Sequence, residues 1–225
     1  VFYVEILAGE RISACHLRRS LAAGDPEHAA RALAGEAVVV ARQRPEAPEE
    51  CRKLFERARM LYTPEQNPAL EAAVLFCEGS AANLRTQPAM AVRPLTQAEA
   101  LLRTRCPDEP WSLILTRQSL ASCWFQLGQS GAQLATLERW LGEAAEHDDR
   151  FDTALLETIG FASLRFVLRD QPERVPQRLE QALVSWPREP FSLLHLGELV
   201  AGQFAAMYGG GDAARQALET ERPRH

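Results

Sequence analysis

A helix, a tight turn and a second helix recur along this chain at a nearly constant interval. The predicted turns stand at positions 24, 86, 128, 170 and 211, so the intervals are 62, 42, 42 and 41 residues. The longer first interval leaves room for one additional helix over about residues 48–61. Because a repeated helix pair cannot bury its apolar face alone, neighbouring pairs stack and share a core. The spacing predicts an all-α fold, an α-solenoid of antiparallel helix pairs with about ten to eleven helices.

Composition favours helices over strands. The chain contains 35 Ala and 30 Leu, but Val and Ile together number only 15. Ala and Leu favour helices, whereas strands draw on β-branched residues. Apolar residues also recur at steps of three and four, which marks one apolar face per helix. One such stripe consists of Leu70, Val74, Cys77, Ala81 and Leu84.

Charge and hydropathy narrow the classes of partner. The net charge is −5, from 25 basic and 30 acidic residues, which works against nucleic-acid binding because that needs a basic face. No apolar run approaches the roughly 20 residues that span a bilayer, so we expect no membrane insertion. The five cysteines are odd in number and form no CxxC pair, which predicts free, reduced thiols in a cytoplasmic protein.

The domain organisation follows from the same patterns. We expect residues 1–225 to form a single repeat domain, since the helical stripes run almost from end to end. The chain opens on Val1 without a methionine, and we expect it to be a fragment of a longer protein.

Residues 119–129, Ser-Leu-Ala-Ser-Cys-Trp-Phe-Gln-Leu-Gly-Gln, resemble a tetratricopeptide repeat. The small residues Ala121 and Ser122 allow two helices to approach, the large Trp124 fills the next layer, and Leu-Gly closes the turn. The interval between turns exceeds the 34 residues usual for this repeat. We therefore expect a tetratricopeptide-like α-solenoid with longer helices.

The chain as a whole resembles the region C-terminal to the kinase domain in large bacterial serine/threonine protein kinases of the eukaryotic-like type. The resemblance rests on Ala23-Gly-Asp-Pro, Ala29–Ala37, Ala98–Cys106 with Trp111, Leu127-Gly, Glu143–Phe151, Arg169-Asp-Gln-Pro, Glu189-Pro-Phe191, His195 and Met207–Asp212. It implies a helical-repeat array that is regulatory or protein-binding. It carries over no catalytic residue, cofactor or metal, and the sequence contains none of the kinase signature motifs.

Two further clusters have a structural interpretation. Acidic residues gather over 143–149 beside His147, and such groups can hold a divalent ion, but Asp148 or Asp149 is better used to cap the next helix. His195 lies in an apolar run, so we expect a core histidine rather than a groove-lining one.

A peptide-binding surface is expected on the concave face that the first helix of each pair builds. Counting back from each turn in steps of three and four places five polar residues there: Asn83, Gln118, Ser122, Gln126 and Glu157. The partner expected for this face is a protein or peptide, either a helix in the groove or a second copy of the chain.

Three functions remain open at this point. The first is a non-catalytic interaction or regulatory module of a bacterial serine/threonine protein kinase, which recruits partners or substrates or mediates self-association. The second is the helical-repeat sensor arm of another bacterial signalling effector, such as an ATPase regulator or a protease. The third, an enzyme in its own right, needs convergent titratable groups in one cavity, and the sequence suggests none.

Overall fold

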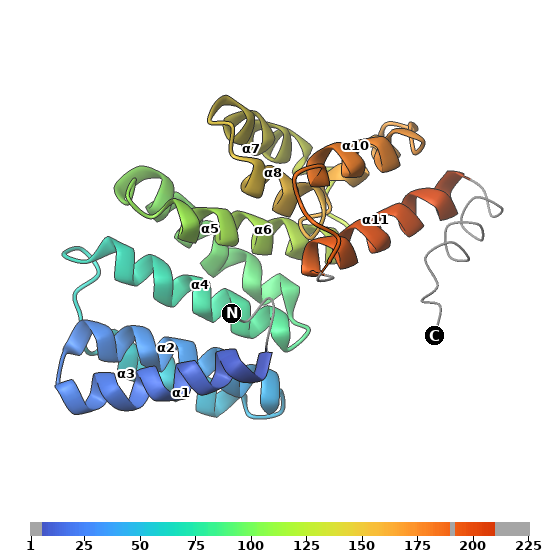
Figure 1. Ribbon diagram of the computed structural model, residues 1–225. Helices are drawn as coiled ribbons and strands as arrows, with labels where there is room; N and C mark the ends of the chain where they lie inside the picture. The colour runs from blue at the N-terminus through green and yellow to red at the C-terminus, as the bar shows by residue number, and fades with distance from the viewer. Residues whose placement is uncertain (1–5, 190–191, 210–225) are drawn as a thin grey trace. The chain divides into compact units, whose positions relative to one another are not determined.

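The computed structural model describes residues 6–189 and 192–209, and over these residues the fold is all-α (Figure 1). Eleven α-helices and one 3₁₀ helix make up this part of the chain, with no strand. Their bounds are α1 Ile6–Ala23, α2 Pro26–Gln43, α3 Pro48–Arg59, α4 Pro68–Leu84, α5 Pro88–Arg105, α6 Pro110–Gln126, α7 Leu134–Glu146, α8 Arg150–Glu157, η1 Ala162–Leu164, α9 Arg165–Leu168, α10 Arg174–Leu183 and α11 Leu193–Gly209. The predicted helix count is confirmed, and α3 is the additional helix predicted in the first interval.

Helices α2 to α6 each begin on a proline. Proline suits the first helical position because its N–H would have no intrahelical partner there and its φ is already helical. Side chains cap the N-termini of some of these helices. The Asp25 carboxylate accepts from the backbone N–H groups of Glu27 and His28 at 3.0 Å, and the bond from His28 lowers the pKa of Asp25. Asn67 caps α4 by accepting from the N–H of Leu70.

The predicted turns coincide with backbone in the left-handed region. Positive φ occurs at Gly24, Thr86, Gly128 and Asp170, which are four of the five predicted turn positions. The fifth, at 211, lies outside the described residues. A left-handed residue just past a helix end closes the last turn and redirects the chain.

Three of these turns share one hydrogen-bond pattern and one residue type. The residue after the left-handed position is glutamine each time, and its N–H donates to the carbonyl five residues earlier. The pairs are Gln87 to Ala82 at 3.0 Å, Gln129 to Trp124 at 2.7 Å, and Gln171 to Phe166 at 2.8 Å. This bond is the mark of a Schellman helix end, which satisfies a terminal carbonyl that would otherwise lack a donor.

Replacing Gly128 with alanine is expected to lower the free energy of unfolding by about 1 kcal/mol, because its φ of +67° is costly for a residue with a Cβ. The control is Gly131→Ala in the same loop, where φ is not positive and a Cβ meets nothing within 4 Å. Urea unfolding of both variants measures the difference. Equal midpoints for the two variants would contradict the role of the left-handed turn.

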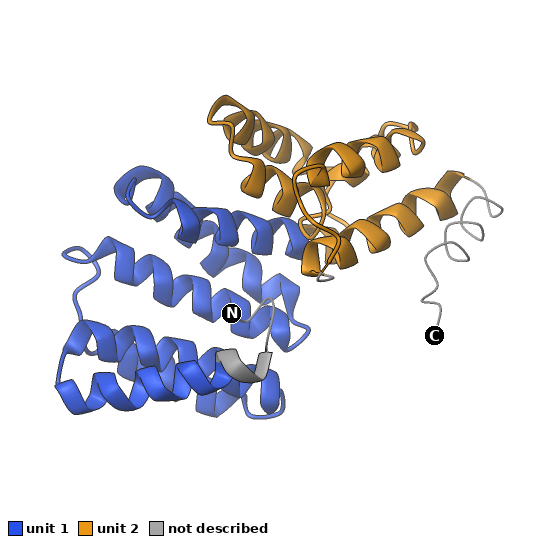
Figure 2. Cartoon of the chain, in the orientation of Figure 1, with its two compact units in different colours: residues 1–123 blue, residues 124–225 orange. Residues whose placement is uncertain are grey.

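The chain divides into two compact units, residues 1–123 and residues 124–225, with the boundary inside α6 (Figure 2). In unit 1, α2 contacts α1, α3 and α4, and α4 contacts α5. The unit 1 core is rich in alanine, including Ala30, Ala34 and Ala37, with Phe55 as its large aromatic. Small side chains allow close helix approach, and at Gly79 an added Cβ would lie 2.5 Å from Cγ of Leu95 on α5.

Unit 2 relies on larger side chains. Trp124 and Trp140 are buried and stack with ring centroids 5.3 Å apart. Phe125 stacks on Phe161 at 4.3 Å and meets Phe204 edge to face at 5.3 Å. Both arrangements are favourable for aromatic pairs and add to the burial of apolar area. Trp124 is buried as the sequence predicts, whereas Trp111 in unit 1 is 55% exposed and does not fill a core.

No helix among residues 6–189 and 192–209 is long and apolar enough to cross a membrane.

Candidate functional site

Of the five polar residues predicted to line a groove, the structure buries two. Asn83 and Ser122 are half-buried in unit 1, and Gln126 is exposed in unit 2. Gln118 is buried, with 6% of its surface exposed, and Glu157 has no exposed surface. Gln118 and Glu157 are therefore interior residues in this structure and present no side chain to a docked peptide.

Glu157 instead anchors a buried charge cluster in unit 2. Its carboxylate accepts two hydrogen bonds from the Arg165 guanidinium, at 2.6 and 2.9 Å, and a third from Nε of Arg178. Arg165 is itself buried and also donates to the Ala162 carbonyl at 2.7 Å. Burying a carboxylate costs free energy unless it is paired and hydrogen-bonded. The role of this cluster is therefore to compensate the buried charge of Glu157.

Unit 1 carries a concave groove. Its volume is about 630 Å³, and it is lined by one face each of α3, α4 and α5. We call it the α3–α5 groove. Its lining residues are Pro48, Cys51, Arg52, Phe55, Arg59, Glu71, Leu75, Glu78, Ala81, Ala82, Arg85, Gln87, Met90, Arg93, Pro94 and Gln97. The contribution from α4 runs from Glu71 to Arg85, which corresponds to about 21 Å of helix.

The two carboxylates of the α3–α5 groove are already engaged. Arg59 donates to Glu78 at 2.7 Å, and Tyr62, just outside the lining, donates its hydroxyl to Glu71. Burial and the bond to Glu71 raise the pKa of Tyr62, so it remains a protonated donor. Burial lowers the pKa of Arg59, but the pairing with Glu78 outweighs that effect and the pKa is raised.

The arginines of the groove are not all engaged. Arg52 is held by Glu49 and Glu56 on its own helix. Arg85 donates from Nε to the Pro45 carbonyl at 3.1 Å. Within the described part of the chain, neither Arg85 nor Arg93 has a carboxylate partner. The groove therefore carries an excess of positive charge at the end formed by the α4–α5 turn.

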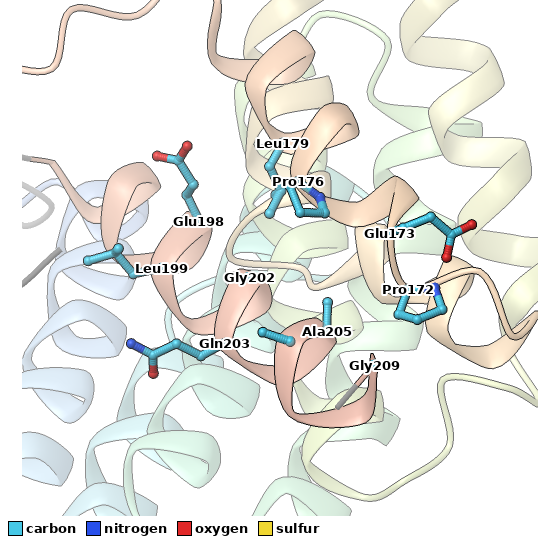
Figure 3. A pocket seen from close by; sticks show the side chains of 11 residues that line it. Pro172, Glu173, Pro176, Leu179, Glu198, Leu199, Gly202, Gln203, Ala205 and Gly209 are labelled. Atoms are coloured by element: carbon cyan, nitrogen blue, oxygen red, sulfur yellow. The ribbon is translucent and has the colours of Figure 1, made fainter. Parts of the chain in front are cut away.

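A second, smaller pocket lies in unit 2 between α10 and α11 (Figure 3). Its volume is about 460 Å³, and its walls are mostly apolar or small, such as Pro176, Leu199 and Gly202. Glu173 and Glu198 lie on opposite sides of it in Figure 3, and Glu198 pairs with Arg188 at 3.0 Å. The pocket is therefore lined mainly by apolar and small side chains, and one of its two glutamates is paired with an arginine.

The other sequence-predicted clusters have structural roles. Asp149 caps α8 by accepting from the N–H of Asp152 at 2.9 Å, as expected. His195 is buried, and its Nδ1 lies 2.9 Å from the Ser192 hydroxyl, which fits the core histidine expected. Among the residues that the structure describes, no group of His, Cys, Asp and Glu has the arrangement of a metal site.

The five cysteines are free thiols, and only Cys15 is exposed. Burial disfavours the thiolate and raises the pKa of Cys77 to about 12 and that of Cys123 to about 11. Burial also raises the pKa of Cys51 and of Cys106.

In native protein at pH 8, one thiol is expected to react rapidly with Ellman's reagent. The thiolate is the reactive form, Cys15 is the exposed thiol, and the raised pKa of the half-buried Cys77 keeps that thiol protonated. Cys15→Ser should remove the fast phase, and unfolding in guanidinium should release all five thiols of the wild-type chain. Two or more fast thiols in the native protein would contradict this assignment.

The α3–α5 groove was missed in the sequence because three consecutive helices contribute to it, and the pattern along one helix does not show which faces of different helices meet. The sequence contains one weak indication of the groove. Arginines fall at one-face spacing on α3, at positions 52 and 59, but the same spacing is typical of any solvated helix face.

Comparison with known proteins finds no matching family model, no matching curated protein and no matching solved structure.

Proposed function

We propose that this chain is a non-catalytic protein-interaction module of a bacterial serine/threonine protein kinase, acting by recruiting a partner or substrate. The observation that carries the proposal is the α3–α5 groove, a surface of about 630 Å³ with apolar side chains at its base and arginines at its margin. Apolar side chains with a few placed charges are the ingredients of a protein-recognition surface.

The non-catalytic assignment is supported by the state of the groove's titratable groups. Glu78 is neutralised by Arg59, and Glu71 accepts from Tyr62, so neither carboxylate is poised as a general base or nucleophile. The assignment to a kinase is supported by the resemblance of the sequence motifs to the region that follows the catalytic domain in such kinases. Binding at a tethered module raises the local concentration of a substrate and needs no chemistry of its own.

Site-specific photocrosslinking tests the proposal. A benzophenone amino acid is placed at Gln97, which is exposed in the α3–α5 groove, or at Gln43, which is exposed on α2 outside it. Each protein is irradiated in extract of the source cells, and crosslinked chains are identified by mass spectrometry. We expect a discrete protein adduct from position 97 and none from position 43. Equal yields, or no adduct at position 97, would overturn the proposal.

A further inference from the structure

We propose that the α3–α5 groove binds an acidic amphipathic helix of a partner protein. This inference rests on the proposed function and names the partner class of the same surface. Three observations carry it: the shape of the groove walls, the composition of its base, and its unmatched positive charge.

The walls favour a helix over an extended peptide. An extended ligand obtains its affinity from main-chain hydrogen bonds to a sheet edge. The walls of this groove are instead the sides of three α-helices, whose backbone groups bond within the helix, and the α4–α5 turn adds Arg85 and Gln87. A groove of this kind takes up side chains that a docked helix presents at positions i, i+3 or i+4, and i+7. The length of about 21 Å along α4 matches about four turns of such a helix.

The base of the groove supplies apolar area. Phe55 and Leu75 form part of it from α3 and α4, and both are largely buried. Met90 from α5 is 67% exposed and so presents apolar surface beside the groove. A flexible methionine can adapt to an incoming apolar side chain, so Met90 is suited to cover the apolar stripe of a helix.

The charge of the groove indicates which charge the polar face of the bound helix should carry. The lining contains four arginines and two glutamates, and both glutamates are engaged within unit 1. Arg85 and Arg93 remain without a carboxylate partner among the described residues. Unit 1 as a whole is neutral, with 15 basic and 15 acidic residues, so the positive charge is a local property of the groove. Carboxylates on the docked helix would pair with both arginines.

Binding is measured by fluorescence anisotropy with a labelled designed helix of about 16 residues, a length of about four turns. The acidic probe has a leucine stripe flanked by glutamates. A second probe replaces every glutamate with lysine, and a third keeps the composition but scrambles the stripe. We expect micromolar affinity for the acidic probe and at least about tenfold weaker binding of the other two, since both charge and stripe contribute.

Substitutions in the full chain locate the contact. The Arg85→Gln, Arg93→Gln double variant should weaken binding of the acidic probe about tenfold, and Met90→Ala about threefold. The matched control is Arg57→Gln, on α3, where the arginine is exposed but does not line the groove. Circular dichroism of each variant reports whether the fold is intact, and exposed side chains such as Met90 should tolerate replacement.

Three results would overturn the inference. One is equal affinity for the acidic and lysine probes, and another is equal affinity for the striped and scrambled ones. The third is a concentration-dependent dimer in sedimentation that the double arginine variant abolishes, because a second copy of the chain would then be the occupant. The first two results would leave a position-97 crosslink to another protein unchanged, whereas the third would turn it into an adduct between two copies of the chain. Failure of this inference is therefore distinguishable from failure of the proposed function.

Discussion

Replacing Glu157 with alanine is expected to lower the free energy of unfolding by about 3–5 kcal/mol, which is a large part of the stability of a typical domain. The substitution leaves the buried Arg165 guanidinium and the half-buried Arg178 guanidinium without the carboxylate that they share. The cost comes from the uncompensated charges, not from the lost attraction alone. Urea unfolding followed by tryptophan fluorescence measures it, since Trp124, Trp140 and Trp186 lie in unit 2.

Two variants sharpen the interpretation of Glu157. Glu157→Gln keeps the shape and an acceptor but removes the charge, and we expect an intermediate loss. Glu180→Ala removes an exposed carboxylate on α10 and should change stability by less than about 0.5 kcal/mol. A loss below about 1 kcal/mol for Glu157→Ala would show that water or neighbouring groups satisfy the arginines in its absence.

Truncation of Trp140 to alanine should destabilise the protein by about 3–5 kcal/mol through loss of buried area and formation of a cavity. The indole is 1% exposed and stacks on Trp124 with an angle of 15° between the ring planes. The midpoint of urea unfolding should fall while the slope of the transition stays constant, which distinguishes lost stability from altered cooperativity.

Trp111 provides the control for Trp140. It lies on α6 in unit 1 and is 55% exposed, so Trp111→Ala should cost about 1 kcal/mol or less. Similar losses at the two positions would mean that the stacked pair contributes little beyond a surface indole, and the account of the unit 2 core would need revision.

The helices and turns could be predicted from the sequence because their causes are local. Gly24 and Gly128 accept positive φ at little cost, and prolines mark the starts of α2 and α5. Thr86 and Asp170 also adopt positive φ, which is unfavourable for threonine and better tolerated by aspartate. Their positions were still predictable because a proline follows two residues later in each case.

The breakdown of the repeat between α8 and α9 was not predictable in the same way. Here the backbone ends α8 at Glu157, passes through Phe161 at a φ of +55°, and continues as η1. No proline marks this break, and Gly160 is the only glycine in it. The buried Glu157 ends α8, and its partners lie 8 and 21 residues further along the chain. A search for apolar residues at steps of three or four does not detect such contacts.

The same limit applies to the candidate site. Counting along single helices placed Glu157 on the surface, where most charged side chains lie. Glu157 is buried instead because the buried Arg165 pairs with it. The α3–α5 groove depends on which faces of three helices meet, and that arrangement is fixed by tertiary packing around small residues such as Gly79.

The sequence-local packing within unit 1 has a kinetic consequence. Among the described residues of unit 1, the main helix contacts join helices one or two places apart along the chain, as α2 does with α1, α3 and α4. Contacts between segments close in sequence require little loop closure, and proteins built from them fold in microseconds to milliseconds. Such a topology also accommodates an additional helix such as α3, which packs on its neighbours α2 and α4, without reordering the contacts between the other helices.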